Sequence, residues 1–255
     1  MTNEKIFLGV PTRDGRIDKG QVNSLIGAFQ SSLVHSIQVQ HGSWITKNFN
    51  SCLANALNSR PNATHFCLLH DDVVPQHPDW LKKLLDISLK FKADVLSVVV
   101  PLKAQLGLTS TALDEQVKDY DQRYRVRRLT MKEVFKREPT FTDPKLLLNT
   151  GLMLIDIRKP WIENCWFEFV DRIEKMGDKF VDVGMSEDWH FSRKAREMGA
   201  SLWATREVSV RHIGGGEFPN DHRGGSWRRT NDTRTTKEAE LAQRSGSIRS
   251  RTVQG

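Results

Sequence analysis

The stretch Leu68-Leu69-His70-Asp71-Asp72-Val73-Val74-Pro75 guides the interpretation of the whole sequence, because an apolar run ends there on ionisable residues. Residues 64–69 are the apolar run, and they predict a short buried strand. In an open parallel sheet, ligands bind beyond the carboxyl ends of the strands. Two adjacent carboxylates at that place can hold a hard divalent cation. An aspartate-rich turn that simply ends a strand would give the same residues without a ligand.

Strand-like and helix-like segments alternate on both sides of this stretch. Strands are predicted at 5–10, 33–40, 64–69 and 94–100, and helices at 18–30, 43–59 and 78–91. In the first helix, Val22, Leu25, Ile26 and Phe29 have the spacing of one helix face. The alternation predicts an α/β fold with a mostly parallel central sheet and helices on both faces.

The second half of the chain has a weaker pattern. Residues 103–144 show little periodicity and are predicted to be an excursion over the active-site face. Residues 146–157 are strand-like, and residues 161–176 have the spacing of a helix. Ser186 is a suitable cap for a further helix that ends at Gly199. A final strand at 201–211 then leads to His212.

Length and composition describe an ordinary globular protein of 255 residues, 38% hydrophobic and 27% charged. The amino terminus lacks the cationic start and apolar run of a signal peptide. No stretch approaches the roughly 18 apolar residues that cross a bilayer. Cys52, Cys67 and Cys165 each lie in an apolar stretch without metal-ligand spacing, which favours reduced core thiols. We therefore expect a cytoplasmic protein.

The net charge of +7 is concentrated in two segments. Residues 121–138 contain seven basic and three acidic residues, and residues 216–255 contain eight basic and five acidic residues. A basic band beside a neutral body is typical of a phosphate-rich partner such as nucleic acid or an anionic glycolipid. A solvated face and a solubilising tail would have the same composition. The low apolar content beyond about Phe218 predicts a flexible tail.

Two further sets of ionisable residues could take part in a reaction together with Asp71 and Asp72. Glu187 and Asp188 lie in the first turn of the helix after Ser186, where the helix dipole favours their ionised form. An ionised carboxylate near a sugar can act as a general base on an acceptor hydroxyl. Helix capping by acidic residues is the structural alternative. His212 ends a strand before three glycines, and imidazole together with carboxylate suits Mn²⁺.

The order of these motifs resembles that of GT-A fold glycosyltransferases, over roughly residues 5–215. The layout is similar to family 2 transferases, and the late histidine is similar to that of mannosylglycerate synthases and polypeptide GalNAc-transferases. The matching motifs are Val10-Pro11-Thr12-Arg13, His70-Asp71-Asp72 at the place of the D-x-D element, Asn149-Thr150-Gly151, Glu187-Asp188 and Val210-Arg211-His212. The sequence departs from that family at His70, which replaces the first carboxylate of the D-x-D element.

The resemblance implies a role for each matching position. Pro11, Thr12 and Arg13 would line the nucleotide pocket, with Lys47 and Asn48 as further contacts and His70 and Asp71 facing the donor. Asp72 and His212 would bind Mn²⁺ or Mg²⁺. Asn149, Thr150, Gly151 and Trp189 would border the sugar and acceptor, with Asp188 as the base and Glu187 orienting the donor or acceptor. The implied domains are a catalytic unit at 1–216, with a donor half at 1–100 and an acceptor half at 101–216, and a basic tail at 217–255.

The implied reaction is transfer of a sugar from a UDP-sugar, or a GDP-sugar, to a hydroxyl acceptor. The basic segments would suit hydroxymethylpyrimidine-containing DNA, whose base would have to be flipped out of the stack. A surface polysaccharide or a lipid-linked glycan is the alternative acceptor. A nucleotidyltransferase would need a glycine-rich, lysine-containing loop after the first strand, which residues 11–15 do not provide. A non-catalytic nucleic-acid-binding protein would not require Asp72, Asp188 and His212.

Overall fold

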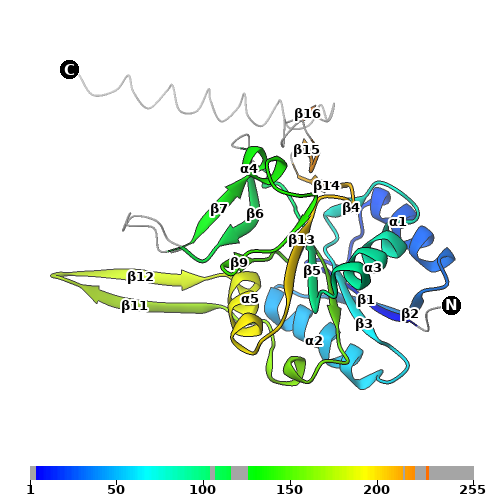
Figure 1. The fold of residues 1–255 in the computed structure, drawn as a ribbon, viewed down its shortest axis with the longest axis horizontal. Coiled ribbons are helices and arrows are strands. Elements are labelled where there is room, and N and C mark those ends of the chain that lie inside the picture. Colours follow the sequence, from blue (N-terminus) through cyan, green and yellow to red (C-terminus); the bar gives the residue numbers. More distant parts are fainter. Residues whose placement is uncertain (1–3, 104–106, 116–125, 215, 222–227, 230–255) are drawn as a thin grey trace, which may run out of the picture.

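The computed structural model describes residues 4–103, 107–115, 126–214, 216–221 and 228–229, and its centre is a seven-stranded sheet (Figure 1). In spatial order the strands are β2 (Val34–His41), β1 (Ile6–Thr12), β3 (His65–Leu69), β10 (Leu152–Asp156), β5 (Val95–Val98), β13 (Leu202–Thr205) and β8 (Thr140–Phe141). The strands predicted at 5–10, 33–40, 64–69 and 94–100 are all present.

The sheet is mixed, whereas the sequence predicts a mostly parallel one. Five strands run in one direction, while β10 and β8 run against their neighbours. The direction of β10 follows from its entry point. The long excursion after β5 ends on the edge of the sheet that carries the strands' carboxyl ends, because His70 N–H donates to Gly151 O there at 3.0 Å. A strand that starts at that edge must run in the opposite direction to β3 and β5.

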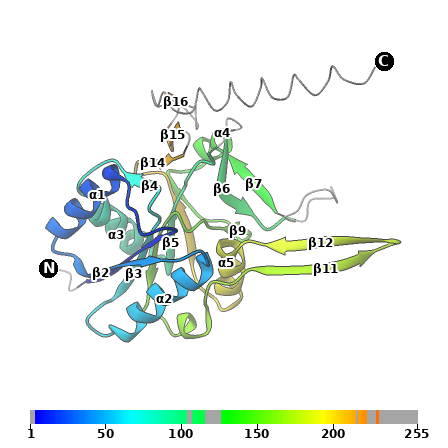
Figure 2. The same ribbon diagram turned by 180° about the vertical axis from the view of Figure 1, so that it is seen from behind.

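Helices cover both faces of the sheet, as predicted (Figures 1 and 2). One face packs against α1 (Lys19–Gln30) and α3 (Trp80–Phe91), and the other against α2 (Ile45–Asn58) and α5 (Glu187–Glu197). Alternation along β1 supplies both cores, since Ile6 and Leu8 join the α1–α3 core while Phe7 joins the α2–α5 core. Burial of these two apolar layers is the main driving force for the fold.

Of the apolar face that its spacing predicts, helix α1 packs only Leu25 against the core. Val22, Ile26 and Phe29 are exposed, whereas Gln21 and Ser24 face inward. The inward side chains make specific hydrogen bonds: Gln21 Nε2 donates to His70 O at 3.1 Å, and Ser24 Oγ donates to Pro75 O at 3.1 Å. These bonds hold the loop between β3 and β4, so the helix presents its polar and small residues to the body of the protein.

The excursion after β5 contains more regular structure than its sequence predicts. A three-stranded sheet has the order β7 (Arg127–Thr130), β6 (Leu108–Leu113) and β9 (Leu146–Leu147), and α4 (Met131–Phe135) follows β7. These elements are too short for a clear hydrophobic period to emerge in a window of 11 or more residues. A capping box at Thr130 and Glu133 nevertheless marks the start of α4.

The helix predicted at 161–176 is wrong. A short 3₁₀ helix, η1 (Pro160–Asn164), is followed by the antiparallel hairpin β11 (Val170–Met176) and β12 (Lys179–Met185). The β-branched residues Val170 and Ile173 favour a strand, and Gly177 has the positive φ of 61° that a two-residue turn needs. The apolar spacing of this segment fits a helix as well as a strand. Gly177, which favours a turn, is the feature that distinguishes the two.

The final strand predicted at 201–211 is two strands in two different sheets. β13 ends at Thr205, and β14 (Val210–Ile213) joins a second sheet with β4 (Val73–Pro75), β15 (Gly216–Pro219) and β16 (Arg228–Arg229). Asn220 secures the bend, since its Oδ1 accepts from Val210 N at 2.9 Å and its Nδ2 donates to Val208 O at 3.0 Å. Most of the predicted tail, 217–255, lies outside the described residues.

The state of the cysteines and the character of the helices bear on two expectations from the composition. All three cysteines are buried and unpaired, as predicted, and burial raises the pKa of the Cys52 and Cys165 thiols to about 12. Within the part of the chain that the structure describes, no helix has the length and apolar character needed to cross a bilayer.

Gly27 provides a test of how α1 is packed. A Cβ at this position would lie 2.7 Å from Pro78 O, a backbone atom that cannot easily move. Gly27→Ala should therefore destabilise the protein by about 1–3 kcal/mol, although alanine in a helix interior normally stabilises by about 1 kcal/mol. Thermal unfolding measures the difference. Asn23→Ala, an exposed change in the same helix, is the control, and a Gly27→Ala protein more stable than wild type would contradict this packing.

Candidate functional site

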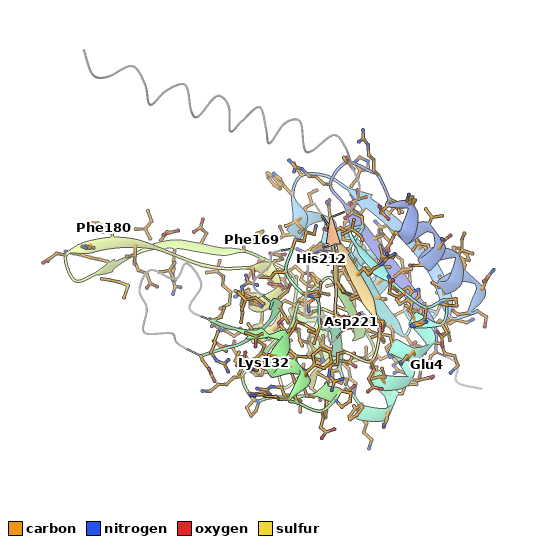
Figure 3. All side chains as sticks on the ribbon, turned by 90° about the horizontal axis from the view of Figure 1, so that it is seen from above. Glu4, Lys132, Phe169, Phe180, His212 and Asp221 are labelled. Carbon is orange, nitrogen blue, oxygen red and sulfur yellow. The ribbon has the colours of Figure 1, made fainter. Side chains whose placement is uncertain are left out.

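The predicted aspartates lie in the loop between β3 and β4, at the carboxyl ends of the parallel strands β1 and β3. Strand β14 brings His212 to the same place, because it pairs antiparallel with β4 and puts His212 opposite Val73. Ile213 N–H donates to Asp72 O at 2.7 Å and closes the junction. Residues 140 positions apart in the sequence thus meet through one strand pair, and Figure 3 shows where His212 lies on the body.

Asp72 is the centre of a polar cluster with His212 and Lys103. Its Oδ2 lies 3.6 Å from His212 Nε2 and 2.5 Å from Lys103 Nζ. The other ring nitrogen, His212 Nδ1, lies 2.8 Å from Pro101 O. A carbonyl can only accept, so Nδ1 carries a proton, and the lone pair of a neutral imidazole is on Nε2. The Oδ1 atom of Asp72 is buried and has no hydrogen-bond partner within the described structure.

The neighbours of this cluster change its protonation. Burial alone would raise the pKa of Asp72, but donation from His212 Nε2–H when that ring is protonated, together with the positive groups around the carboxylate, holds that pKa well below its usual range. Burial lowers the pKa of His70 to about 4, so this imidazole is neutral at physiological pH. Burial and the adjacent Asp72 raise the pKa of Asp71, opposed by a hydrogen bond from Thr12. Asp72 is therefore firmly ionised.

A pocket of about 390 Å³ opens beside the aspartates. It is lined by Pro11, Thr12, Arg13, Gly42, Ser43, Ile45, Asn48, Phe49, His70, Asp71 and Asp72. Six of the predicted donor-binding residues are therefore in its wall: Pro11, Thr12, Arg13, Asn48, His70 and Asp71. The pocket has the size of a small-molecule site and combines an apolar lining with a few polar groups.

The two predicted contacts from α2 have different positions. Asn48 lies in the pocket wall, and its Nδ2 donates to Gly42 O at 2.8 Å, which holds the loop after β2. Lys47 is exposed and is not in that wall. The structure therefore brings one of the two predicted α2 contacts to the pocket.

The Asn149-Thr150-Gly151 segment is buried directly behind the aspartate loop. Asn149 Nδ2 donates to Val98 O at 2.9 Å, and its Oδ1 accepts from Gly151 N at 3.1 Å. A Cβ on Gly151 would lie 3.1 Å from Val100 Cγ2 and 3.2 Å from Val73 Cγ2. In this structure the segment positions β10 against the loop that carries His70.

Glu187 and Asp188 begin α5, as predicted, and both have unusual protonation. Burial, followed by the charge of Asp188, raises the pKa of Glu187 to about 7. Burial also raises the pKa of Asp188 to about 6, although Oδ1 of Asp188 accepts hydrogen bonds from Ser186 Oγ and Trp189 N–H. Carboxyls that titrate near neutral pH are suited to general acid–base chemistry.

A chain of aromatic rings connects α5 with the aspartate loop. The ring of Phe191 stacks on Phe167 at 4.4 Å between centroids, and Phe167 meets Phe49 edge-on at 5.3 Å. Phe49 in turn lies 5.0 Å from the ring of His70. Glu187 is one helical turn before Phe191, so it shares the side of α5 that faces this chain.

Trp189 does not have the exposed ring that a sugar or base would require. It is 1% exposed, its Nε1 donates to Ser110 O at 3.0 Å, and the guanidinium of Arg128 lies 4.5 Å from its ring centroid. The predicted place of Trp189 at the border of the sugar and acceptor is therefore corrected to a core position, because the ring is buried and the Arg128 guanidinium covers it.

The predicted basic band is partly used within the protein. Arg127 pairs with Glu115 and Glu133, each at 2.7 Å. Arg137 pairs with Asp143 at 3.3 Å and covers the ring of Phe141. Residues 121–125 of this band, and most of the basic tail, lie outside the described residues. Arg127 and Arg137 are therefore engaged in ion pairs within the protein.

Sequence reasoning missed two residues at this site. Lys103 was grouped with the aperiodic excursion, yet its side chain reaches Asp72, and its Cδ would lie 2.8 Å from a Cβ at Gly214. Gln21 lies in the first predicted helix without a signal of its own, yet its side chain donates to His70 O. The Gly214 position was a usable signal, because glycine there leaves room for the lysine chain.

Comparisons with known proteins support the fold at a coarse level. No protein-family model matches the chain, and no curated protein matches it in sequence. The structure is similar to the crystal structure of A197 from STIV, with a TM-score of 0.50 and 15% identity over 82% of this chain and 85% of that one. It also aligns with GalNAc-T7 crystallised with UDP, GalNAc and Mn²⁺, with a TM-score of 0.45 and 12% identity over 83% of this chain and 44% of that one.

These similarities concern fold alone. The large mixed sheet with helices on both faces is consistent with a GT-A-like fold, which is the coarser part of the fold prediction. The comparisons do not distinguish a family within that fold.

The raised pKa of Glu187 has a measurable effect on stability. A carboxyl whose pKa rises from 4.5 to about 7 on folding binds its proton more tightly in the folded protein. The free energy of unfolding of the wild type must then fall as the pH rises through this window. Glu187→Gln removes the titration, so its stability relative to wild type should increase between pH 5 and 8.

Chemical denaturation at several pH values measures this difference. Glu197→Gln, an exposed change in the same helix, is the matched control and should leave the pH profile as in the wild type. A constant difference between Glu187→Gln and wild type across the window would show that Glu187 is ionised throughout.

Proposed function

We propose that this protein is a metal-dependent glycosyltransferase that uses a nucleotide-sugar donor, with a UDP-sugar as the first candidate and a GDP-sugar as the second. One observation supports the proposal most strongly. Asp72 and His212 come together beside a 390 Å³ pocket, at the edge of the sheet where α/β proteins bind ligands.

The residues present fit a divalent cation. Asp72 has an Oδ1 without a partner in the described structure, and His212 has its Nε2 lone pair directed toward the same carboxylate. The hydrogen bond from Nδ1 to Pro101 O fixes the ring, as expected for a histidine ligand. No group of three or more His, Cys, Asp or Glu among the described residues could form a complete site. Phosphate oxygens of a donor and water would therefore have to supply the other ligands.

The chemistry that follows is mainly electrostatic. A cation at Asp72 and His212 would neutralise the charge that develops on a diphosphate leaving group. Lys103 places an ammonium at the same carboxylate, and Arg13 places a guanidinium in the pocket wall. Fixed positive groups near a leaving phosphate stabilise it without reorganisation at the moment of reaction. Pro11, Thr12 and Asn48 would border the nucleotide.

We assign the base to the Glu187–Asp188 pair. Glu187 is less engaged than Asp188, because Ser186 and Trp189 both donate to Asp188 Oδ1. Glu187 also has the higher pKa, about 7 against about 6. Asp188 was the base expected from sequence, and we propose that the two carboxylates act as a unit with Glu187 able to take the proton.

A glycan hydroxyl is the acceptor that we favour. DNA containing hydroxymethylated pyrimidines would require a continuous cationic surface, yet Arg127, Arg128 and Arg137 are engaged within the protein. Asn149, Thr150 and Gly151 would support the sugar-binding side from behind the aspartate loop. A surface polysaccharide or a lipid-linked glycan would present such a hydroxyl.

Donor hydrolysis tests the proposed reaction class. The purified protein is incubated with UDP- and GDP-sugars and Mn²⁺, and released nucleoside diphosphate is measured. Slow release is expected, with loss of at least about tenfold in Asp72→Ala, since removing a metal ligand removes transition-state stabilisation. Glu187→Gln and Asp188→Asn should bind donor normally and reduce transfer to an acceptor. Release of pyrophosphate from a nucleoside triphosphate would instead indicate a nucleotidyltransferase, and binding to DNA without any turnover would indicate a nucleic-acid-binding protein.

Lys103 gives an independent test of the cation site. Its ammonium lies 2.5 Å from Asp72 Oδ2 and competes with a metal ion for that oxygen. Lys103→Met should therefore bind Mn²⁺ several-fold more tightly in calorimetry, because two like charges no longer share one carboxylate. Lys83→Met, an exposed change on α3, is the control. Weaker binding of Mn²⁺ by Lys103→Met would contradict a cation site at Asp72.

A further inference from the structure

The hairpin of β11 and β12 extends away from the body of the protein (Figures 1 and 3). Its two strands pair only with each other among the described strands. Its base is fixed, because Val170 and Met185 pack with Trp189 in a small apolar cluster. A two-stranded ribbon on its own is marginally stable in water. We therefore expect the part of this ribbon beyond its base to be stabilised by a further contact.

The register divides the side chains between two faces. Residues directly opposite each other in an antiparallel pair lie on the same face. The face of Val170 and Met185 is directed toward the body through the apolar cluster. We call the other one the outer face, and it carries Asp171 beside Gly184, Ile173 beside Asp182, and Lys175 beside Phe180.

The outer face carries large apolar side chains in water. Ile173 is 75% exposed and Phe180 is 72% exposed. Phe169, two residues before Asp171, is 55% exposed at the base of the ribbon, and Figure 3 shows Phe169 and Phe180 at opposite ends of it. Apolar side chains gathered on one projecting surface mark an interaction site rather than ordinary surface scatter.

We propose that the outer face binds the outer face of a second copy of this chain, so that the protein is a dimer with two-fold symmetry. The charge of the ribbon favours this partner over a polyanion. Residues 170–185 contain four acidic and three basic residues, so the ribbon is slightly negative although the whole chain is +7. An anionic membrane or a nucleic acid would not select the negative part of a basic protein.

A two-fold axis that crosses the ribbons at Ile173 pairs chemically matched groups. A two-fold interface brings residue i of one copy to residue j of the other, and j to i. With the ribbons antiparallel, Ile173 then meets Ile173 of the second copy. Lys175 and Asp171 lie two residues on either side of Ile173, so each lysine meets an aspartate of the second copy.

The same two-fold axis places a large side chain of one copy opposite a glycine of the other. Phe180 lies beside Lys175 and Gly184 lies beside Asp171, so each phenylalanine would lie over the glycine of the second copy. A Cβ at Gly184 has only Val170 O within 3.4 Å, at 3.3 Å, which leaves space above the glycine for a ring. The two Asp182 side chains would lie near the axis, and each already has a partner within its own chain. The antiparallel arrangement also keeps the two bodies at opposite ends of the paired ribbons.

Charge reversal tests this pairing directly. Sedimentation of the full chain at increasing concentration, up to about 1 mM so that even an interface of about −4 kcal/mol is populated, should show a dimer. Lys175→Asp and Asp171→Lys should each weaken the dimer by about tenfold or more, because both symmetric pairs become repulsive. The double variant Lys175→Asp with Asp171→Lys should restore the dimer, since opposite charges meet again.

Matched controls exclude a general effect of charge or folding. Lys179→Asp makes the same charge change on the opposite face of the ribbon and should leave the dimer intact. Ile173→Asp should abolish it, with thermal unfolding of each variant confirming a folded body. A wild type that stays monomeric at all concentrations, or single reversals that remain dimeric, would overturn the proposal. Monomers whose binding to phosphatidylcholine–phosphatidylglycerol vesicles is lost in Phe180→Ser would assign the outer face to lipid instead.

Discussion

The pairing of β4 with β14 is the constraint on which the candidate site depends. It is short, with three residue pairs from Val73 to Pro75, yet it joins the loop after β3 to the segment after β13. Asp72 and His212 contribute their side chains from the ends of these strands, and Ile213 N–H closes the loop onto Asp72 O. Asn220 reinforces the arrangement from the far side of β14. Without this small sheet, the aspartates would be a surface turn and the histidine a loop residue.

The loop that carries the aspartates is held from three sides by polar contacts. Gln21 holds His70 O from α1, Gly151 O accepts from His70 N, and Thr12 hydrogen-bonds Asp71. Burying these polar groups would be unfavourable without partners, and their partners come from parts of the chain that are far apart in sequence. This explains why α1 turns Gln21 and Ser24 toward the loop and the neighbouring strand.

The sequence was informative where a strong local signal coincided with the tertiary structure. The apolar run at 64–69 followed by His70-Asp71-Asp72 located the site, and Ser186 and Gly199 marked the limits of α5. The sequence-based prediction was wrong at residues 161–176, where the apolar spacing fits both a helix and a strand. It also missed the elements within residues 108–147, which are too short to show a hydrophobic period. The direction of β10 and the contact of Lys103 with Asp72 depend on how distant segments meet. A short segment of sequence does not show which distant segments meet. Gly214 is a partial exception, because the absence of a side chain there leaves room for Lys103.

The acidic residues of the candidate site fall into two groups whose pKa values are shifted in opposite directions. The sequence alone does not distinguish the two groups. Around Asp72, positive neighbours outweigh burial and keep the carboxylate ionised. At Glu187 and Asp188, burial prevails and raises the pKa of both carboxyls toward neutrality. The same residue types therefore have opposite protonation behaviour, and the phenylalanine chain from Phe191 to Phe49 lies between the two groups.

The ribbon has a mechanical consequence for α5. β12 ends at Met185 and α5 begins at Glu187, so a single residue, Ser186, separates the two elements. Ser186 also donates its hydroxyl proton to Asp188. Whatever restrains the ribbon is thereby transmitted to the first turn of this helix. A molecule that immobilises the projecting arm would fix the orientation of two carboxyl groups that it never touches.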